Sequence, residues 1–176
     1  LPANLAVALH PDFEYVAVDA GDGEVYVLAR DLVESCMASF GRPDPTILAR
    51  LDPKKLERKA CRHPFYQRDS IIVLGTHVTL DAGTGCVHTA PGHGREDHEV
   101  GIAYGIEAYS PVDDRGRFTP EVEFFSGQFV FDANASITAK LRETGALVQA
   151  GRLRHSYPHC WRCKQPVIFR ATKQWF

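Results

Sequence analysis

Residues 81–98 read Asp-Ala-Gly-Thr-Gly-Cys-Val-His-Thr-Ala-Pro-Gly-His-Gly-Arg-Glu-Asp-His and hold a strand, a tight turn and a helix start in succession. The apolar residues predict a strand at residues 86–89, Pro91 and Gly92 predict the turn, and the acidic residues that follow open a helix over residues 96–104. A chain that changes direction after a strand and exposes helix N-terminal amides favours a polar pocket. The same residues also fit a purely structural turn before a helix, and the pattern alone favours neither interpretation.

Short apolar and β-branched runs on both sides of this stretch predict further strands. We expect them at residues 5–9, 13–19, 24–28, 70–74, 77–80, 108–112, 147–157 and 167–171. Helices are expected at residues 31–40, before Gly41, and at residues 133–143, closed by Gly145. Because many strands are scattered among a few short helices, the sequence predicts an α+β fold centred on a β-barrel of mostly antiparallel or mixed strands. No repeat or linker divides residues 1–176, so we expect a single domain.

The composition is that of a globular domain. The 176 residues are 44% hydrophobic and 24% charged, and no apolar run approaches the ~20 residues that span a bilayer, so a membrane protein is excluded. Five cysteines, an odd number, fit a reducing compartment, and we expect a cytoplasmic protein. The chain begins at Leu1 without an initiator methionine and ends on an apolar segment, so we expect a piece cut from a larger protein.

The charge is unevenly distributed along the chain. Residues 50–68 hold seven Lys or Arg against two acids, and the residues after Glu143 hold six basic side chains and no acid, although the net charge is −2. This asymmetry fits a surface that faces a polyanion, and it equally fits solvated faces of no special function.

A metal-dependent hydrolase is one interpretation of residues 93–98. His93-Gly-Arg-Glu-Asp-His98 resembles the His-x-His-x-Asp-His pattern of metallo-β-lactamase-type hydrolases, except that Arg95 stands in place of the second histidine. Arginine does not ligate zinc, so one arm of that site is missing. His88, His93, Asp97 and His98 remain candidate ligands if folding gathers them.

A second segment with metal-binding character is His155-Ser-Tyr-Pro-His-Cys-Trp-Arg-Cys163. Its Cys-x-x-Cys turn presents Cys160 and Cys163 to one tetrahedral ion, but a structural zinc needs four ligands. His155 or His159 supplies a third ligand in one arrangement. We favour a half zinc knuckle whose partner ligands lie outside this chain, and the alternative is a reduced pair that holds no metal.

Three motifs together resemble the inserted editing domain, or connective peptide, of bacterial isoleucyl-tRNA synthetases. They are Leu-Pro-Ala-Asn at residues 1–4, Gly-Thr-Gly-Cys-Val-His-Thr-Ala-Pro-Gly-His-Gly at residues 83–94, and the Cys-Trp-Arg-Cys segment followed by Ala-Thr-Lys-Gln-Trp-Phe at residues 171–176. The resemblance covers essentially the whole chain. It implies that residues 155–176 are returning strands and the half zinc knuckle, leading towards the catalytic core of the synthetase.

The resemblance implies proofreading hydrolysis of valine wrongly attached to isoleucine tRNA. Its partners would be the 3′ acceptor end of that tRNA and the rest of the synthetase chain, which binds ATP and acts as the ligase. It implies a monomer, an editing reaction without a cofactor, and a structural zinc at most. Two alternatives remain: a structural zinc-knuckle module without catalysis, and a metal-dependent hydrolase.

The resemblance also assigns candidate site residues. Asp97, nine residues after His88, would bind the protonated α-amino group of the substrate, His88 would line the pocket, and Asn4 would hydrogen-bond near the adenosine or the water. Further substrate contacts are expected from Thr84, Gly92, His93 and Gly94. No Ser-His-Asp or Cys-His nucleophile is present in the motifs, so we expect a positioned water to attack the ester.

Overall fold

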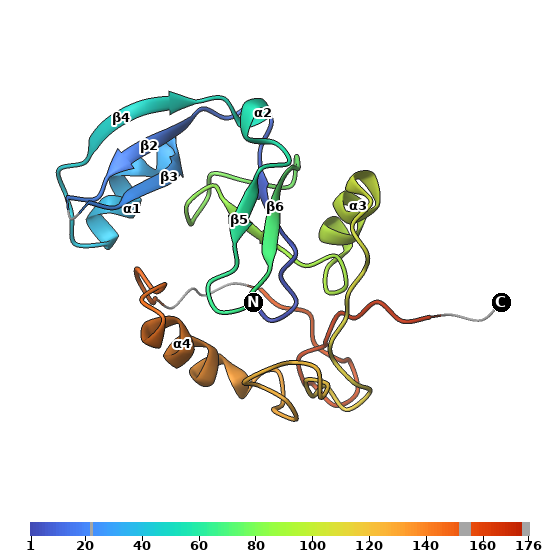
Figure 1. Cartoon of the computed structure of the whole chain (residues 1–176). Helices are drawn as coiled ribbons and strands as arrows, with labels where there is room; N and C mark the ends of the chain where they lie inside the picture. Colours follow the sequence, from blue (N-terminus) through green and yellow to red (C-terminus); the bar gives the residue numbers. More distant parts are fainter. Residues whose placement is uncertain (22, 152–155, 174–176) are drawn as a thin grey trace.

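The computed structural model describes residues 1–21, 23–151 and 156–173, which form two open sheets and a few short helices (Figure 1). The first sheet has the strand order β5-β6-β1-β7, and the second has the order β3-β2-β4. In chain order the strands are β1 (Ala6–Leu9), β2 (Tyr15–Asp19), β3 (Val25–Ala29), β4 (Thr46–Leu51), β5 (Ala60–Arg62), β6 (Asp69–Leu74) and β7 (Val87–Thr89). The helices are η1 (Arg30–Leu32), α1 (Val33–Ser39), α2 (Pro53–Leu56), α3 (Arg95–Tyr104) and α4 (Ala133–Glu143).

Strand β1 lies at the heart of the first sheet. It runs parallel to β6 and antiparallel to β7, in a register that sets Val7 opposite His88. Ala6 and Ala8 are fully buried, and the core behind them packs against α3. This small, tightly packed strand therefore carries the N-terminal residues directly alongside β7.

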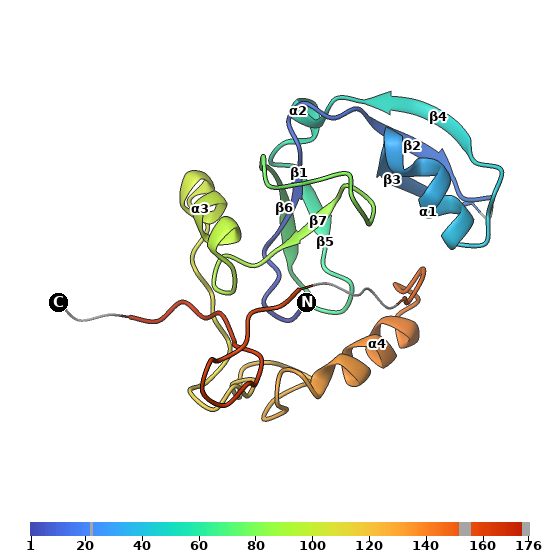
Figure 2. The ribbon, with the colours of Figure 1, turned by 180° about the vertical axis from the view of Figure 1, so that it is seen from behind.

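The second sheet has its own core, built on Val16, Val18 and Leu28 and covered by α1 (Figure 2). The buried Tyr15 ties it to the chain before β7, because its hydroxyl donates to the carbonyl oxygen of Gly85 at 2.7 Å. The turn that leads into β7 is thus fixed from the side of the second sheet.

A third cluster of buried side chains lies between β7 and the C-terminal segment. Phe118, Phe125 and Ala133 are at its centre, and isolated bridges such as Val112 with Phe118 replace regular strands there. Helix α4 starts from this cluster and lies below the N-terminus in both views, at the opposite end of the molecule from α2 (Figures 1 and 2). This arrangement places α4 beside the first residues of the chain.

The α+β class with mostly antiparallel strands is confirmed, but the expected barrel is not: both sheets remain open. Strands β4 and β5 and helix α2, in the charged stretch after Gly41, were not expected from the sequence. Residues 77–80 form no strand, because the chain turns at Thr76 and His77, where the amide of Val78 bonds the carbonyl oxygen of Gly75.

The expected closing strands are also corrected. Residues 108–112 and 167–171 are extended but form no strand, and Pro111 and Pro166 each remove an amide from any ladder. Of the expected strand at residues 147–157, residues 152–155 lie outside the described part, and its described residues form no strand. No helix in the described ranges is long and apolar enough to cross a membrane.

Candidate active site

A pocket of about 240 Å³ opens between the N-terminal residues, β7, α4 and the C-terminal segment. Its wall is largely apolar and includes Pro2, Val130 and Ile137, whereas His88, His93 and Asn134 bring polar groups to it. Residues from four distant parts of the chain therefore meet around one small, mostly apolar space. Such a concave space with a few polar groups is typical of a small-molecule site.

Asn4 and His88 form a hydrogen-bonded pair at this pocket. Asn4 is buried, with 5% of its surface exposed, and its side-chain nitrogen lies 2.9 Å from the carbonyl oxygen of Ala6 and 2.6 Å from Nδ1 of His88. The hydroxyl of Ser70 donates to Oδ1 of Asn4, which orients the amide with its NH2 group towards His88. Nδ1 of His88 therefore accepts, and the ring proton resides on Nε2.

The environment keeps the His88 ring neutral. Desolvation by the surrounding protein lowers the pKa of His88 to about 4, although part of the side chain reaches solvent. A second proton, on Nδ1, would point at the hydrogen atoms of the Asn4 NH2 group. The hydrogen bond from Asn4 therefore disfavours the imidazolium form of His88. At neutral pH His88 therefore supplies a steric wall and an Nε2–H donor.

Asp97 lies in the first turn of α3 and faces the end of β7. Its Oδ2 accepts a hydrogen bond from the backbone amide of Ala90 at 2.8 Å, and Gly94 precedes the helix without a side-chain cap. One carboxylate oxygen thereby fixes the turn that carries His93. The structure brings Asp97 to this turn, but Asp97 is not part of the described lining of the His88 pocket.

The turn itself is packed tightly against two other segments. A Cβ atom on Gly92 would lie 2.2 Å from the carbonyl oxygen of Tyr109, and the carbonyl oxygen of Gly92 accepts from the amide of Ala171 at 2.8 Å. Nδ1 of His93 donates to the carbonyl oxygen of Phe169 at 3.0 Å, and burial lowers the pKa of this ring. The chain near residue 170 thus covers the turn.

Gly92 and Gly94 line a second pocket, of about 330 Å³, together with His98 and residues 169–172. Thr84 lies outside the described lining of both pockets. Its hydroxyl accepts from the amide of Cys86 at 3.2 Å, and its carbonyl oxygen accepts from the amide of Ala29. The structure thus places Thr84 apart from both pockets, at the end of β3.

The possible metal ligands after the turn do not converge. Nδ1 of His98 donates to the carbonyl oxygen of Pro91 at 3.1 Å, while His93 and Asp97 bond to other backbone groups. Across the described residues, no three His, Cys, Asp or Glu side chains form a group that could hold a metal ion. The geometry therefore gives no support to a metal-dependent hydrolase built on these three residues.

The turn at Cys160 and Cys163 has the chemistry of half a metal site. The backbone amides of Cys163 and Arg162 donate to the Cys160 sulfur and lower the pKa of its thiol, which favours the thiolate that binds metal. The left-handed residue Lys164, with φ 57°, closes the turn, and its amide bonds the carbonyl oxygen of Cys160. His155 lies outside the described residues, and Nδ1 of His159 donates to the carbonyl oxygen of Tyr157.

Two residues at the site were missed by the sequence analysis. Ser70 orients Asn4, and Arg68 binds the carbonyl oxygens of Pro2 and Asn4. The one signal for them was a serine at a position that an otherwise apolar strand buries, with 2% of its surface exposed. A buried hydroxyl needs a hydrogen-bond partner, and here that partner is Asn4.

The fold defines the class of domain. It is shared with a crystal structure described as GlLeuRS-CP1, a connective peptide of a leucyl-tRNA synthetase, with a TM-score of 0.50, 17% sequence identity, and coverage of 81% of this chain and 63% of that one. The chain thus has the fold of that connective-peptide domain. No family model matches the sequence.

The sequence relatives give the particular family. Over all 176 residues the chain is 62% identical to an isoleucine–tRNA ligase of Desulfovibrio desulfuricans, and 60% identical to that of Geobacter sulfurreducens. It spans about a fifth of these curated relatives, 19% of the length of each. Over its whole length the chain thus matches one stretch of isoleucine–tRNA ligases, and it corresponds to their editing, or connective-peptide, domain.

Proposed function

We propose that this domain hydrolyses the ester that links a wrongly attached valine to isoleucine tRNA. The observation that carries the proposal is the small apolar pocket in which Asn4 presents a neutral His88. The largely apolar wall suits a short branched side chain, and the His88 ring would bound the space that this side chain occupies. The similarity of the chain to isoleucine–tRNA ligases supports isoleucine tRNA as the tRNA of this proposal.

The need for such a second pocket is physical. A synthetic site that accepts isoleucine rejects valine only through one missing methylene, a discrimination known for this very family to be limited to about 1–3 kcal/mol. A second pocket that excludes the larger isoleucine side chain by steric clash removes valine selectively. Hydrolysis in that pocket then corrects the errors of the first site.

Each polar group near the pocket would have a role in hydrolysis of the ester. The Asp97 carboxylate, anchored through Oδ2 to Ala90, would bind the α-ammonium group of the aminoacyl ester. His88 would donate from Nε2 and bound the side chain, while Gly92, His93 and Gly94 would contact the substrate from the turn. A water molecule would attack the ester carbonyl, with Asn4 near the terminal adenosine or the water.

The partners follow from the same proposal. The domain would receive the tRNA 3′ acceptor end from the rest of the synthetase chain, act in the cytoplasm, and function within a monomer. Basic residues at positions 50–68 would face the tRNA backbone, although Arg50 and Lys54 are already paired with Glu14 and Asp12. ATP binding and ligation would belong to the remainder of the synthetase.

The proposal is tested with the full-length synthetase. Valyl and isoleucyl esters of isoleucine tRNA are incubated with the enzyme, and we expect the valyl ester to be cleaved at least about tenfold faster. Cleavage should slow as salt rises, because phosphate contacts weaken. Added chelator should leave the rate unchanged. Equal cleavage of both esters would overturn the proposal, and loss under chelator with an unchanged circular dichroism spectrum would instead favour a metal-dependent hydrolase.

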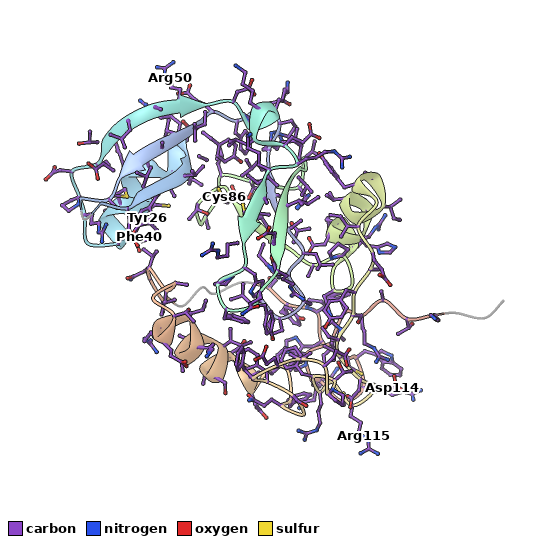
Figure 3. The ribbon with its side chains drawn as sticks, in the orientation of Figure 1. Tyr26, Phe40, Arg50, Cys86, Asp114 and Arg115 are labelled. Atoms are coloured by element: carbon purple, nitrogen blue, oxygen red, sulfur yellow. The ribbon has the colours of Figure 1, made fainter. Side chains whose placement is uncertain are left out.

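Replacing Cys86 with alanine should leave the deacylation rate within about twofold of the wild-type rate. Burial raises the pKa of the Cys86 thiol to about 12, so the nucleophilic thiolate is not formed at neutral pH. The thiol lies between the two sheets and points to the carbonyl oxygen of Val27 at 3.4 Å (Figure 3). Deacylation is measured in parallel with an Asp97→Asn enzyme as the impaired reference, and a comparable loss in Cys86→Ala would indicate a covalent thioester pathway.

A structural zinc-knuckle module is the second candidate function. The observation that favours it is the Cys160 turn, whose amides stabilise a thiolate. Cys160 and Cys163 would hold the ion together with ligands from the rest of the synthetase, and the ion would fix the return of the chain to the synthetic core. Hydrolysis that is insensitive to Asp97 would favour this module over the editing site.

A further inference from the structure

The first four residues of the chain form a wall of the pocket without belonging to any strand. Leu1, Pro2 and Ala3 line the pocket, and the buried Asn4 holds His88. We call residues 1–4 the strap. Because a strap outside the sheet has no ladder of its own, other groups must fix its carbonyl oxygens.

Arg68 fixes two of these carbonyl oxygens. Its Nη2 donates to the carbonyl oxygen of Pro2 at 2.6 Å and to that of Asn4 at 3.0 Å. Two residues later, within β6, Ser70 donates to the side chain of Asn4. Arg68, in the bend just before β6, therefore binds the backbone of Asn4, and Ser70 binds its side chain.

The guanidinium group of Arg68 is itself held in place. It lies over the ring of Tyr66, 4.9 Å from the ring centre, and 5.7 Å from that of Tyr109. Tyr109 is also the residue whose carbonyl oxygen packs against Gly92. Half-buried Arg68 thus connects the strap with the segment that supports the turn.

We propose that Arg68 is a positioning residue for ester hydrolysis, which holds the strap so that Asn4 keeps its amide on Nδ1 of His88. The inference rests on the proposed function for its kinetic part only. Without the guanidinium group, the carbonyl oxygens of Pro2 and Asn4 lose a charge-assisted donor and the strap shifts. Nδ1 of His88 then loses its fixed donor, and its ring populates both tautomers.

The tautomer of His88 is the direct readout. Nitrogen-15 spectra of the histidine-labelled 176-residue chain should show a proton on Nε2 alone in the wild type, and a mixture of tautomers in Arg68→Met. Arg68→Lys keeps a cationic donor of similar length and should restore the wild-type signal. An unchanged His88 signal in Arg68→Met would overturn the proposal. If Arg68→Met does not fold, the Arg68→Lys spectrum decides: a proton on Nε2 alone supports the proposal, and a mixture of tautomers overturns it.

Kinetics of the full-length synthetase separate positioning from tRNA binding. Arg68→Met should lower kcat for valyl ester hydrolysis about tenfold or more, with KM changed less than about threefold, and Arg68→Lys should recover most of the rate. A loss confined to KM, together with a weaker salt dependence, would identify Arg68 as a phosphate contact and overturn the proposal.

Arg115→Met is the matched control, because it removes the same charge from an exposed loop at the outer edge of the molecule (Figure 3). Its kcat and its His88 spectrum should equal those of the wild type. If wild-type synthetase hydrolyses neither ester, the proposed function fails, while the spectra still decide whether Arg68 sets the His88 tautomer.

Discussion

Replacing Asp97 with asparagine should lower kcat/KM for hydrolysis of the valyl ester about 10- to 100-fold, the equivalent of one lost charge-assisted hydrogen bond. The carboxylate has two tasks in the proposed site. It anchors the turn through Ala90, and it would bind the α-ammonium group of the substrate. Asparagine keeps an oxygen that accepts from the amide of Ala90 and removes only the charge.

Comparison with Asp97→Ala separates these two tasks. Alanine removes the anchor as well, so it should lose at least as much activity and also unfold at a lower urea concentration, since the amide of Ala90 is left without its partner. Urea unfolding followed by circular dichroism measures the second effect. Asp97→Asn should unfold close to the wild type.

Glu96→Gln is the matched control for charge. Glu96 lies in the same first turn of α3 and is exposed. Its replacement removes one negative charge at the same helix terminus and should leave hydrolysis unchanged. Full activity in Asp97→Asn, or an equal loss in Glu96→Gln, would contradict the proposed role of Asp97. Either result would favour the structural zinc-knuckle module over the editing site.

Replacing Gly92 with alanine should destabilise the domain by about 3 kcal/mol or more. The new Cβ would lie 2.2 Å from the carbonyl oxygen and 2.7 Å from the carbonyl carbon of Tyr109. These are backbone atoms, so no side-chain rotation relieves the clash. The turn or the segment at Tyr109 must move, and activity should fall with it.

Gly83→Ala is the control for this effect. Gly83 has φ +79°, but a Cβ there would meet nothing within 4 Å, so only backbone strain of about 1 kcal/mol is expected. The free energies of unfolding of both variants are obtained from urea titrations. Similar values for the two variants would mean that the turn is not packed against Tyr109 as described.

Local patterns were sufficient for several elements. Alternating and β-branched runs predicted β1, β2, β3, β6 and β7, and glycine-terminated apolar patterns predicted α1 and α4, because each of these elements buries one face. β4 was missed because its side chains are exposed or only half-buried, and it exists through pairing with β2. The short β5 likewise depends on β6.

The expected barrel failed for a related reason. Residues 108–112 and 167–171 contain apolar side chains, but prolines in or next to them remove amides that a ladder needs. Each segment makes only single contacts, such as the bridge of Val112 with Phe118 and the hydrogen bond from the amide of Ala171 to the carbonyl oxygen of Gly92. The apolar side chains of these two segments predicted that they are buried, which is correct only in part. Side-chain hydrophobicity does not indicate which strand, if any, a segment pairs with.

The sequence by itself determined the family, the turn before α3 and the candidates Asn4, His88 and Asp97, because these depend on residue identity and short spacing. The tertiary structure alone decided that Asn4 meets His88, 84 residues away, and that Ser70 and Arg68 hold Asn4 in place. The tautomer and charge of an imidazole are set by the groups that surround it in space. Those groups come from β6, β7 and the strap, and only the pairing of the strands brings them together.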